Sequence, residues 1–237
     1  MKVIQSLKSS LTENTVTTIG TFDGVHVGHK KIIERLVKTA KDDQLKSTVL
    51  TFFPHPRMVL QKDANIKLIN TIDERCKLLE AQGLDYVVIK PFTKSFSRLS
   101  AEEFVTTILV DQLHVKKIII GYDHHFGKGR NGNIELLKAM GTSLNFKVEE
   151  INEQLVHNEI ISSTLIRNYI SDQQIKKAND LLGYAYFFEG FVVRGNHDNP
   201  AYFTGEFDTD NLKLLPDYTV VNVNGINFSI FCNFCFS

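Results

Sequence analysis

Residue types suited to phosphate chemistry gather near the N-terminus. The stretch from Thr18 to His29 holds two histidines and three glycines, namely His26, His29, Gly20, Gly24 and Gly28. Glycines let the backbone approach an anion closely, and the amides at a helix N-terminus carry partial positive charge. The two imidazoles can give protons or hydrogen bonds to phosphate oxygens. The spacing therefore predicts a triphosphate site with a nucleotide as its ligand.

A second cluster, far along the chain, has complementary chemistry. The hydroxyls of Ser162, Ser163 and Thr164 can cap a helix, and Arg167 lies one turn further on, where it can clamp a phosphate through two hydrogen bonds. The H-x-G-H pattern alone is only moderately specific, since two histidines near a helix start can also be solvated or capping residues. Together, the two clusters are expected to surround a triphosphate from two sides.

The elements that must position these residues alternate between strands and helices. Runs rich in apolar and β-branched residues predict five strands, at 15–19, 47–53, 86–89, 117–120 and 146–150. Helical spacing between them, at Ile32, Ile33, Leu36 and Val37, together with three expected capping boxes, predicts intervening helices. The expected boxes pair Thr71 with Glu74, Ser100 with Glu103, and Ser171 with Gln174, and Gly183 is expected to end the last helix. This alternation predicts a Rossmann-like α/β domain with a parallel sheet.

Five unusual polar or aromatic clusters each follow one of these strands. They are Gly20–His29, Pro54–Arg57, Phe92–Phe96, Tyr122–Arg130 and Ser162–Arg167. Ligands of open parallel sheets bind beyond the carboxyl ends of the strands, near the point where the strand order reverses. We therefore expect the five clusters to meet at one face of the domain.

The character of the sequence changes after Gly183. Residues 184–237 are aromatic, strand-prone and rich in turns, and Asn224-Gly225 between two apolar runs predicts a β-hairpin. This divides the chain into an α/β domain at 1–183 and a small all-β domain at 184–237. A unit this small is marginal as an independent core, so it is expected to lean on the first domain or on another chain.

Composition narrows the classes of partner. Lys plus Arg equals Asp plus Glu, at 27 each, so no basic excess favours nucleic acid or an anionic membrane. A secretion signal and a span of roughly 18 apolar residues are not found, which predicts a cytoplasmic protein. Cys232 and Cys235 form a C-x-x-C pair near the C-terminal end, but two further ligands are not evident nearby, so no metal site is expected.

The combined motifs resemble the prokaryotic bifunctional riboflavin kinase/FAD synthetases, within the H-x-G-H nucleotidyltransferases. The resemblance runs from about Val16 to Gly190, through T-I-G-T-F-D-G-V-H-V-G-H, T-F-F-P-H-P-R, F-T-K-S-F-S-R-L-S-A-E-E-F, G-Y-D-H-H-F-G-K-G-R-N-G, I-S-S-T-L-I-R and A-N-D-L-L-G-Y. It implies transfer of AMP from ATP to FMN, giving FAD and pyrophosphate, with Mg²⁺ bound largely by ATP and water.

The resemblance also implies roles for individual residues. His26, His29 and Arg167 would be catalytic. ATP would bind at Gly20, Thr21, Phe22, Asp23, Gly24, Gly28, Ser162, Ser163 and Thr164, where Asp23 either orients His26 or simply forms the turn. Flavin would bind at Phe53, Pro54, His55, Pro56, Arg57, Asp123 and Phe126.

The sequence departs from the family pattern in two places. His124 and His125 stand where the family has an aromatic residue and an arginine, which bears on flavin affinity and pH dependence. Glu189–Gly195 resembles the first strand of the kinase barrel, but Asn196–Phe207 lacks the G-F-P-T-A-N motif, so kinase activity is expected to be lost. The 184–237 segment would then be a structural remnant that could form a homo-oligomer contact. Two alternatives stay open, a flavin- or nucleotide-binding regulator without turnover and an adenylyltransferase for another phosphorylated acceptor.

Overall fold

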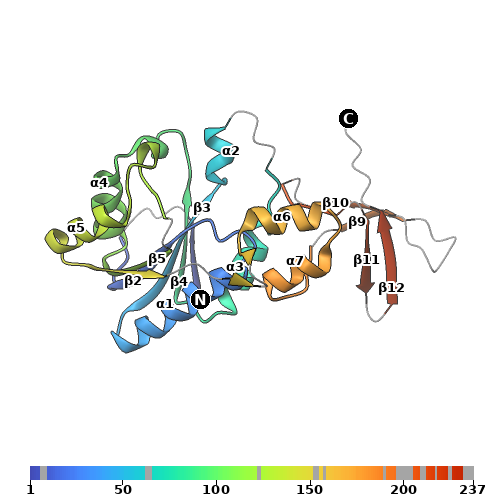
Figure 1. The fold of residues 1–237 in the computed structure, drawn as a ribbon, viewed down its shortest axis with the longest axis horizontal. Coiled ribbons are helices and arrows are strands. Elements are labelled where there is room, and N and C mark those ends of the chain that lie inside the picture. The colour runs from blue at the N-terminus through green and yellow to red at the C-terminus, as the bar shows by residue number, and fades with distance from the viewer. Residues whose placement is uncertain are drawn as a thin grey trace.

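The structure of the chain is a computed structural model. It describes residues 1–5, 10–61, 66–121, 124–151, 155–156, 159–188, 191–195, 205–208, 212–216, 218–223 and 226–231. Figure 1 shows the helices around one central sheet, with α6 and α7 beside it and the strands β9 to β12 beyond them.

The central sheet has six parallel strands in the order β1-β4-β3-β2-β5-β6. Their bounds are β1 Lys2–Gln5, β2 Thr15–Ile19, β3 Lys46–Phe53, β4 Tyr86–Pro91, β5 Val115–Gly121 and β6 Lys147–Ile151. From β2 the chain adds β3 and β4 on one side and then returns to add β5 and β6 on the other. The strand order therefore reverses between β2 and β5, where this class of sheet forms its ligand crevice.

Helices connect the strands and cover both faces of the sheet. Their bounds are α1 Val27–Asp42, α2 Pro56–Leu60, α3 Ile72–Glu80, α4 Ala101–Glu103, α5 Ile134–Leu144, α6 Ser163–Ser171 and α7 Ile175–Leu182. The helix of α4 continues as a wider, π-type turn over η2, Phe104–Gln112. Short 3₁₀ turns lie at η1, Phe96–Arg98, and η3, Lys128–Arg130.

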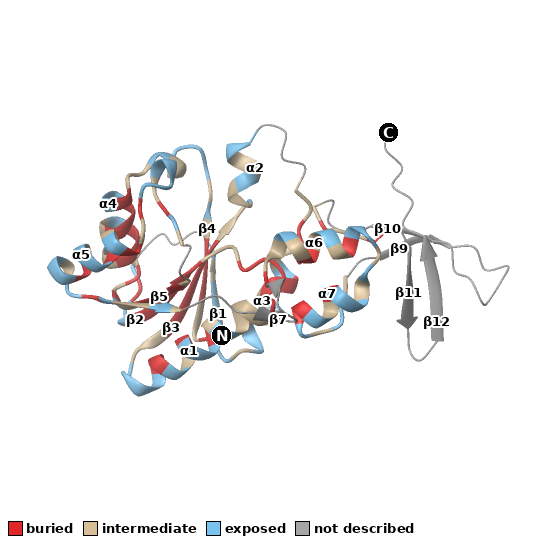
Figure 2. Cartoon of the chain, in the orientation of Figure 1, coloured by how far each residue is buried: buried red, intermediate tan, exposed pale blue. Residues whose placement is uncertain are grey.

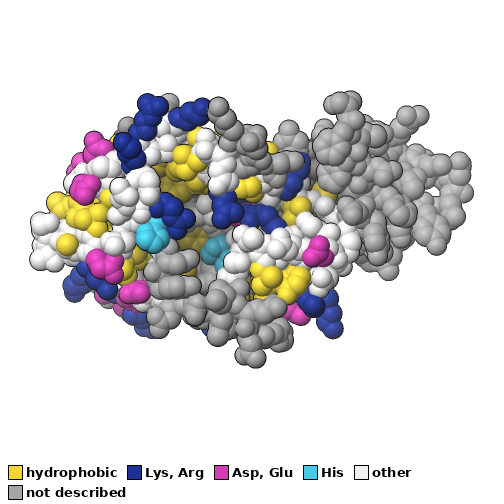
Figure 3. Space-filling model, turned by 45° about the horizontal axis from the view of Figure 1, so that its top comes forward, with side chains coloured by type: hydrophobic (Ala, Val, Ile, Leu, Met, Phe, Trp, Pro, Cys, Tyr) yellow, Lys and Arg dark blue, Asp and Glu magenta, His cyan; other side chains and the backbone are white. Residues whose placement is uncertain are grey.

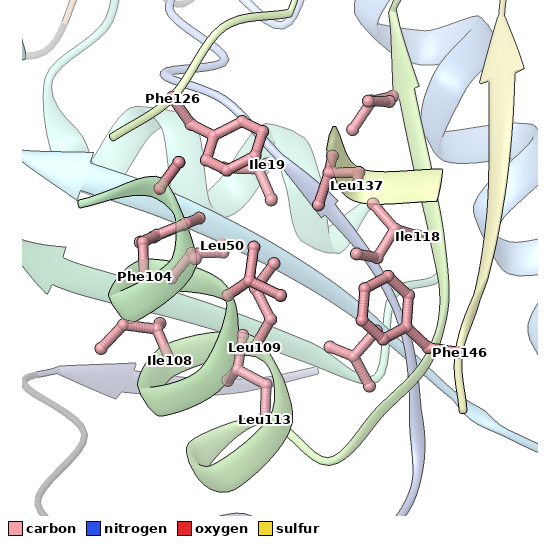
Figure 4. Packing of buried hydrophobic residues seen from close by; sticks show 14 of the residues in the cluster. Ile19, Leu50, Phe104, Ile108, Leu109, Leu113, Ile118, Phe126, Leu137 and Phe146 are labelled. Carbon is pink, nitrogen blue, oxygen red and sulfur yellow. The ribbon is translucent and has the colours of Figure 1, made fainter. Parts of the chain in front are cut away.

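Alternate residues of the buried strands face two separate cores. On β3, Leu50 belongs to the core that η2 and α5 cover, whereas Val49 belongs to the core that α1 and α3 cover. Figure 4 shows the first of these cores, where Phe104 and Leu109 of η2 pack towards Leu50 and Ile118 of the sheet. Figure 2 shows that the buried residues concentrate on the strands and on the inner faces of the helices. The sheet is thus covered on both faces, as a parallel sheet requires.

The predicted α/β class and all five predicted strands are confirmed, within one to a few residues at each end. The four-residue edge strand β1 is additional. The boxes at Thr71 with Glu74 and Ser100 with Glu103 form as expected. The prediction of a third capping box, at Ser171 with Gln174, is wrong. Helix α6 continues through Ser171, and Gln174 makes no side-chain cap for α7. Gly183 ends α7 in the left-handed conformation, with φ of 68°, as predicted.

The chain beyond α7 contributes antiparallel strands in pairs. β9 (Phe191–Gly195) pairs with β10 (Gly205–Asp208), and β11 (Tyr218–Val223) pairs with β12 (Ile226–Phe231). The register of β11 and β12 joins Val223 to Ile226, so the predicted hairpin forms, although its turn residues lie outside the described part of the chain. Another short antiparallel pair, β7 (Leu155–Val156) and β8 (Glu159–Ile160), precedes α6. Cys232 and Cys235, the C-x-x-C pair of the sequence, also lie outside the described residues.

Among the helices that the structure describes, none combines the length and apolar character needed to cross a bilayer.

Candidate functional site

A cavity of about 560 Å³ opens at the carboxyl ends of the strands. Its walls come from the ends of β2, β3, β5 and β6 and from the first turns of α1 and α6. This volume suits a nucleotide-sized ligand. Figure 3 shows histidine and basic side chains gathered around a hollow in this face of the molecule.

Most of the predicted site residues line this cavity. They are Gly20, Thr21, Phe22, His26, Gly28, His29, His55, Pro56, Arg57, Ser162, Ser163, Thr164 and Arg167. His124, His125 and Arg130, from the cluster after β5, line it as well. Residues separated by more than a hundred positions in the sequence therefore meet at one cavity, as the positions of the strand ends predicted.

Other predicted residues lie behind the wall or elsewhere. Asp23 and Gly24 are buried beneath the cavity, and Phe53 and Pro54 do not line it. Phe126 is buried in the core, where its ring lies 5.6 Å from that of Phe104. Asp123 lies outside the described residues.

The aromatic cluster after β4 supports the wall rather than forming it. Phe92 and Phe96 pack against Phe52, with ring centroids 5.7 Å and 5.8 Å away, and it is Phe52 that lines the cavity. Four of the five predicted clusters thus contribute lining residues, and the fifth positions one.

His26 caps helix α1 with its side chain. Its Nδ1 accepts a hydrogen bond from the backbone N–H of His29 at 3.2 Å. Burial lowers the pKa of His26 to about 4, although the carboxylate of Asp23 opposes this shift. The ring is therefore neutral near pH 7, and because Nδ1 accepts a hydrogen bond, the ring proton lies on Nε2. His26 can serve a ligand as a neutral hydrogen-bond donor.

His29 stacks on His26, with ring centroids 3.6 Å apart and an interplanar angle of 15°. Burial lowers the pKa of His29 well below its ordinary value, and His26 and Arg75 lower it further. Its Nδ1 is buried and has no hydrogen-bond partner among the described residues. A buried polar atom of this kind commonly has a ligand or water as its partner.

Helix α6 directs its N-terminus into the cavity opposite α1. Ser162 is its cap, since its Oγ accepts from the backbone N–H of Leu165 at 3.2 Å. The hydroxyl of Ser163 instead donates to the carbonyl of Asp23 at 2.8 Å. Of the three expected capping residues, Ser162 is therefore the one that caps the helix, and Thr164 is an exposed residue of the cavity wall.

Neither of these two helices has an acidic residue in its first turn. Acidic side chains in that position normally balance the positive pole of the helix dipole. The described residues that line the cavity also include no Asp or Glu. The cavity therefore favours an anionic ligand, and most strongly a phosphate chain between the two helix ends.

A buried carboxylate fixes the geometry beneath the cavity. Asp23 has no exposed surface, and its Oδ2 accepts from Nη2 of Arg167 at 2.6 Å. Its Oδ1 accepts from Nη2 of Arg75 at 3.1 Å. The backbone amides of Ile69 and Asn70 also donate to this carboxylate, each at 3.1 Å. Asp23 thus orients two guanidinium groups and makes no hydrogen bond to His26. The predicted turn is confirmed, because Asp23 and Gly24 lie in a turn that the N–H of Val25 closes by donating to the carbonyl of Phe22 at 3.1 Å.

The charge of Asp23 is held in place by these contacts. Burial alone would raise the pKa of its carboxyl, but the two arginines and the two backbone amides lower it below the usual value. One carboxylate then faces two guanidinium groups, which leaves a net positive charge under the cavity floor. Arg75 is only 1% exposed on α3, and no pattern in the sequence indicated it, because its partner lies in a distant loop.

The loop between β2 and α1 holds an unusual backbone conformation. Phe22, Gly24 and Val25 have φ of 49°, 88° and 35°, and a β-branched residue such as Val25 is strained there. Val25 is completely buried, so packing holds it in this conformation. A Cβ on Gly24 would lie 3.0 Å from Cδ1 of Ile69. Glycine therefore fits this position for both conformation and space.

The opposite rim carries the flavin-side candidates. His55 caps α2, since its Nδ1 accepts from the backbone N–H of Arg57 at 3.2 Å. Burial lowers the pKa of His55 to about 4, against the opposing effect of Asp23. His124 stacks on Phe126 at 6.1 Å, so this histidine occupies an aromatic environment.

The donor set does not form a protein cage for magnesium. Mg²⁺ prefers carboxylate oxygens, but Asp23 is already paired with two arginines, and it is not part of the wall. Among the residues that the structure describes, no group of three or more His, Cys, Asp or Glu side chains is placed to hold a metal ion. A metal at this site would need the oxygens of a bound phosphate chain.

The parallel sheet, its switch point and the cavity between two helix N-termini define a Rossmann-like nucleotidyltransferase domain. More particularly, the chain belongs to the FAD synthetase family, whose profile matches residues 8–165. The resemblance seen in the motifs is thereby confirmed.

Several bifunctional riboflavin kinase/FMN adenylyltransferases are similar to this chain. One from Buchnera aphidicola subsp. Schizaphis graminum is 40% identical over 83% of the chain and 64% of the relative. Another, from Buchnera aphidicola subsp. Acyrthosiphon pisum, is 35% identical over 94% of the chain and 71% of the relative. One from Listeria monocytogenes is 33% identical over 92% of the chain and 68% of the relative. The chain thus spans about two thirds of the length of these relatives.

A solved structure has the same fold. The crystal structure of a macrolide-efflux protein from Streptococcus pneumoniae matches with a TM-score of 0.83 and 26% identity, over 96% of this chain and 77% of that protein.

Proposed function

We propose that the chain is an FMN adenylyltransferase, which transfers AMP from ATP to FMN and releases pyrophosphate. The observation that carries this proposal is that His26, His29 and Arg167 line one cavity between the N-termini of α1 and α6. The matched family and the names of the similar relatives support it.

The proposed reaction is a direct displacement at phosphorus. A phosphate oxygen of FMN attacks the α-phosphorus of ATP, and the bond from that phosphorus to the oxygen bridging to the β-phosphate breaks. The electron pair of this bond leaves with pyrophosphate, and the new bond is the P–O–P link of FAD. No protein nucleophile takes part, so the protein positions the reactants and stabilises charge.

The residues of the cavity have matching roles in this proposal. The neutral His26 donates through Nε2–H and His29 through its free ring nitrogen when protonated there, both towards oxygens on which negative charge grows. The N-terminus of α6 and the guanidinium of Arg167 stabilise the departing pyrophosphate. Asp23 holds the guanidinium of Arg167 in position through a hydrogen bond and does not itself contact ATP.

The flavin side and the metal are proposed more simply. His55, Pro56 and Arg57, together with Phe52, would contact FMN, and His124 and His125 would lie beside the ring system. Magnesium would arrive bound to the phosphate oxygens of ATP, since the described wall has no free carboxylate for it. When bound, the ion would reduce the negative charge of the phosphate chain.

The test is incubation of the chain with FMN, ATP and magnesium, followed by chromatography of flavins and an assay for pyrophosphate. Formation of FAD with an equal amount of pyrophosphate supports the proposal. If ATP or FAD raises the melting temperature but pyrophosphate is not released, a binding protein without turnover is favoured. If pyrophosphate forms only with another phosphorylated acceptor from a panel, FMN is not the acceptor and the proposal is contradicted on that point.

Riboflavin kinase activity is proposed to be lost, since the sequence over 196–207 lacks the motif that serves ATP and magnesium in the kinase. Incubation with riboflavin in place of FMN tests this, because any FMN or FAD formed would contradict it. The division at residue 183, the cytoplasmic location and a homo-oligomer contact through 184–237 also stand as proposals. Nucleic acid and membranes are not among the proposed partners.

A further inference from the structure

Residues outside the matched family region are built into the floor of the nucleotide site. Lys213 follows the strands β9 and β10, yet its side chain is completely buried against the α/β domain. It lies far along the sequence from every predicted site residue, and the mechanism proposed above does not use it. Its contacts lead step by step to Arg167.

The first step is the contact between Lys213 and the segment that follows α2. The segment Lys67–Asn70 runs parallel to 212–214, with Leu68 N–H donating to Leu212 O at 2.6 Å and Leu214 N–H donating to Leu68 O at 2.7 Å. Nζ of Lys213 donates to the carbonyl of Ile69 at 2.7 Å and to Oε2 of Glu74 at 2.6 Å. The two segments are thus joined by both backbone and side-chain hydrogen bonds.

The buried ammonium is fully surrounded by partners. It also donates to the carbonyl of Phe187 at 2.8 Å and lies 4.7 Å from the ring centre of Tyr186. Glu74 is 1% exposed and also closes the capping box of α3 through the N–H of Thr71. A buried ion pair with these hydrogen bonds fixes the relative position of the elements that carry it.

The second step is the contact between the Lys67–Asn70 segment and Arg167. Nε of Arg167 donates to the carbonyl of Lys67 at 2.9 Å. The amides of Ile69 and Asn70 hold the carboxylate of Asp23, which in turn binds Nη2 of Arg167. Both attachments of this guanidinium therefore depend on the segment that Lys213 holds.

A neighbouring contact joins the same region to the glycine-rich loop. Tyr184 follows α7, and its hydroxyl donates to the carbonyl of Gly24 at 2.7 Å and also lies 3.3 Å from Oδ1 of Asn70. The hydroxyl of Tyr186 donates to the carbonyl of Leu214. Residues beyond Gly183 thus contact both the loop and the segment beneath the cavity.

We propose that Lys213 is a positioning residue for the nucleotide site, which acts through the Lys67–Asn70 segment and Asp23 to place the guanidinium of Arg167. This inference rests on the proposed function for its kinetic readout, but not for its binding readout. It gives part of the C-terminal region a role in ATP recognition, apart from any kinase chemistry or contact between subunits.

The test compares variants of the full chain. Lys213→Met keeps the length of the side chain and removes the donor, and Lys213→Met with Glu74→Gln also removes the unpaired buried carboxylate while leaving a residue that can close the capping box. The dissociation constant for ATP is measured by calorimetry on folded protein, together with KM for ATP and for FMN. We expect the ATP dissociation constant and KM to rise about tenfold in both variants, while KM for FMN changes little.

Two controls separate positioning from loss of stability. Lys176→Met makes the same chemical change at an exposed site on α7 and is expected to leave ATP binding unchanged. Leu109→Ala lowers stability from the opposite core and is expected to lower the melting temperature without raising KM for ATP. If single-variant protein does not fold, the double variant and Tyr186→Phe, which loosens the same segment more gently, are measured in the same way.

Unchanged ATP affinity in the folded variants would overturn the inference, as would equal increases in KM for ATP and FMN. An effect of the same size in Leu109→Ala would do so too. FAD formation by the unaltered chain tests the proposed function separately. A chain that binds ATP but makes no FAD would contradict that function and still allow the affinity comparison to decide the role of Lys213.

Discussion

The imidazole pair at the start of α1 is neutral near pH 7. The two rings are stacked, with His26 buried and His29 half-buried at the cavity wall, and burial lowers both pKa values, that of His26 to about 4. Neutral imidazoles give directed N–H donors without the cost of charging a buried group. The residue types predict a phosphate-binding role, which stays a prediction, but the protonation of the two rings depends on burial, which sequence alone does not report.

His29→Ala should lower kcat for FAD formation by about 100-fold or more, because it removes a preorganised donor at the reacting phosphates. The melting temperature should change little, since the side chain is only partly buried. Steady-state kinetics and circular dichroism of the purified variant measure the two quantities. Lys31→Ala, an exposed change on the same helix, is the control, and an unaltered kcat in His29→Ala would remove that residue from the mechanism.

Stability should depend on pH through His26. Its pKa is about 4 in the folded chain against 6.5 as its ordinary value, so the unfolded chain binds more protons between these values. The contribution of His26 to the free energy of unfolding should therefore be fully present above about pH 6.5. It should decrease as the pH is lowered towards about 4, by at most about 3 kcal/mol for this group.

His26→Asn isolates this contribution, because asparagine keeps a capping side chain but does not titrate. Urea unfolding at several pH values should show a smaller loss of stability on acidification in the variant than in the parent chain. His55, whose pKa is lowered in the same direction, should account for part of the dependence that remains. Parallel pH profiles for the two proteins would contradict the assignment to His26.

At the scale of elements, two helix ends face each other across the cavity. Each is closed by a polar side chain, His26 on α1 and Ser162 on α6, and each lacks acidic residues in its first turn. The strand ends that carry the connecting loops could be predicted from the alternation of apolar runs. The exact capping residue could not, because Ser162, Ser163 and Thr164 are chemically equivalent candidates until the helix start is known.

Ser162→Ala should cost about 1 kcal/mol of stability and also weaken ATP binding, because the cap orients the amides that face the phosphates. Ser100→Ala removes the cap of α4, which lies outside the cavity wall, and should cost a similar stability without affecting ATP binding. Thermal unfolding and calorimetric titration with ATP measure both effects. Equal ATP affinities in the two variants would show that α6 does not hold the phosphates.

Other elements were missed or misplaced for identifiable reasons. The strand β1 is short and carries Lys2 and Gln5 at its ends, so its apolar signal is weak, and only pairing with β4 makes it a strand. The expected box at Ser171 and Gln174 has the right residues, but packing of α6 extends that helix past its start. In both cases, contacts with residues distant in the sequence determine the secondary structure more strongly than the local sequence pattern does.

At the scale of the whole molecule, charge is balanced in number but segregated in space. The chain has 27 basic and 27 acidic residues, whereas the described wall of the cavity has arginines and histidines and no carboxylate. The composition shows no excess of basic residues, but it contains no information on where in the fold the charged residues gather. The contacts of Lys213 with the α/β domain were likewise beyond sequence reasoning, because nothing near residue 213 specifies Glu74 as its partner.

This segregation predicts a dependence on salt. Raising the ionic strength from about 0.05 M to about 0.5 M should increase the dissociation constant for ATP several-fold, because screening shortens the range of the cavity's positive charge. Adenosine, which lacks the phosphates, should bind with nearly the same affinity at both salt concentrations. Calorimetric titrations with the two ligands test this, and equal salt effects would show that the phosphate chain does not meet the basic wall.

The pairing of β1 with β4 alone also bears on how the chain is made. Lys2–Gln5 precedes the other strands of the central sheet in the sequence, but its hydrogen-bonding partner is Tyr86–Pro91, so it must wait until β2, β3 and β4 have been synthesised. Closing so long a loop is slow compared with forming the helices between. β1 therefore joins the sheet only after strands that follow it in the sequence, and nascent chains that end before β4 leave it without a hydrogen-bonding partner.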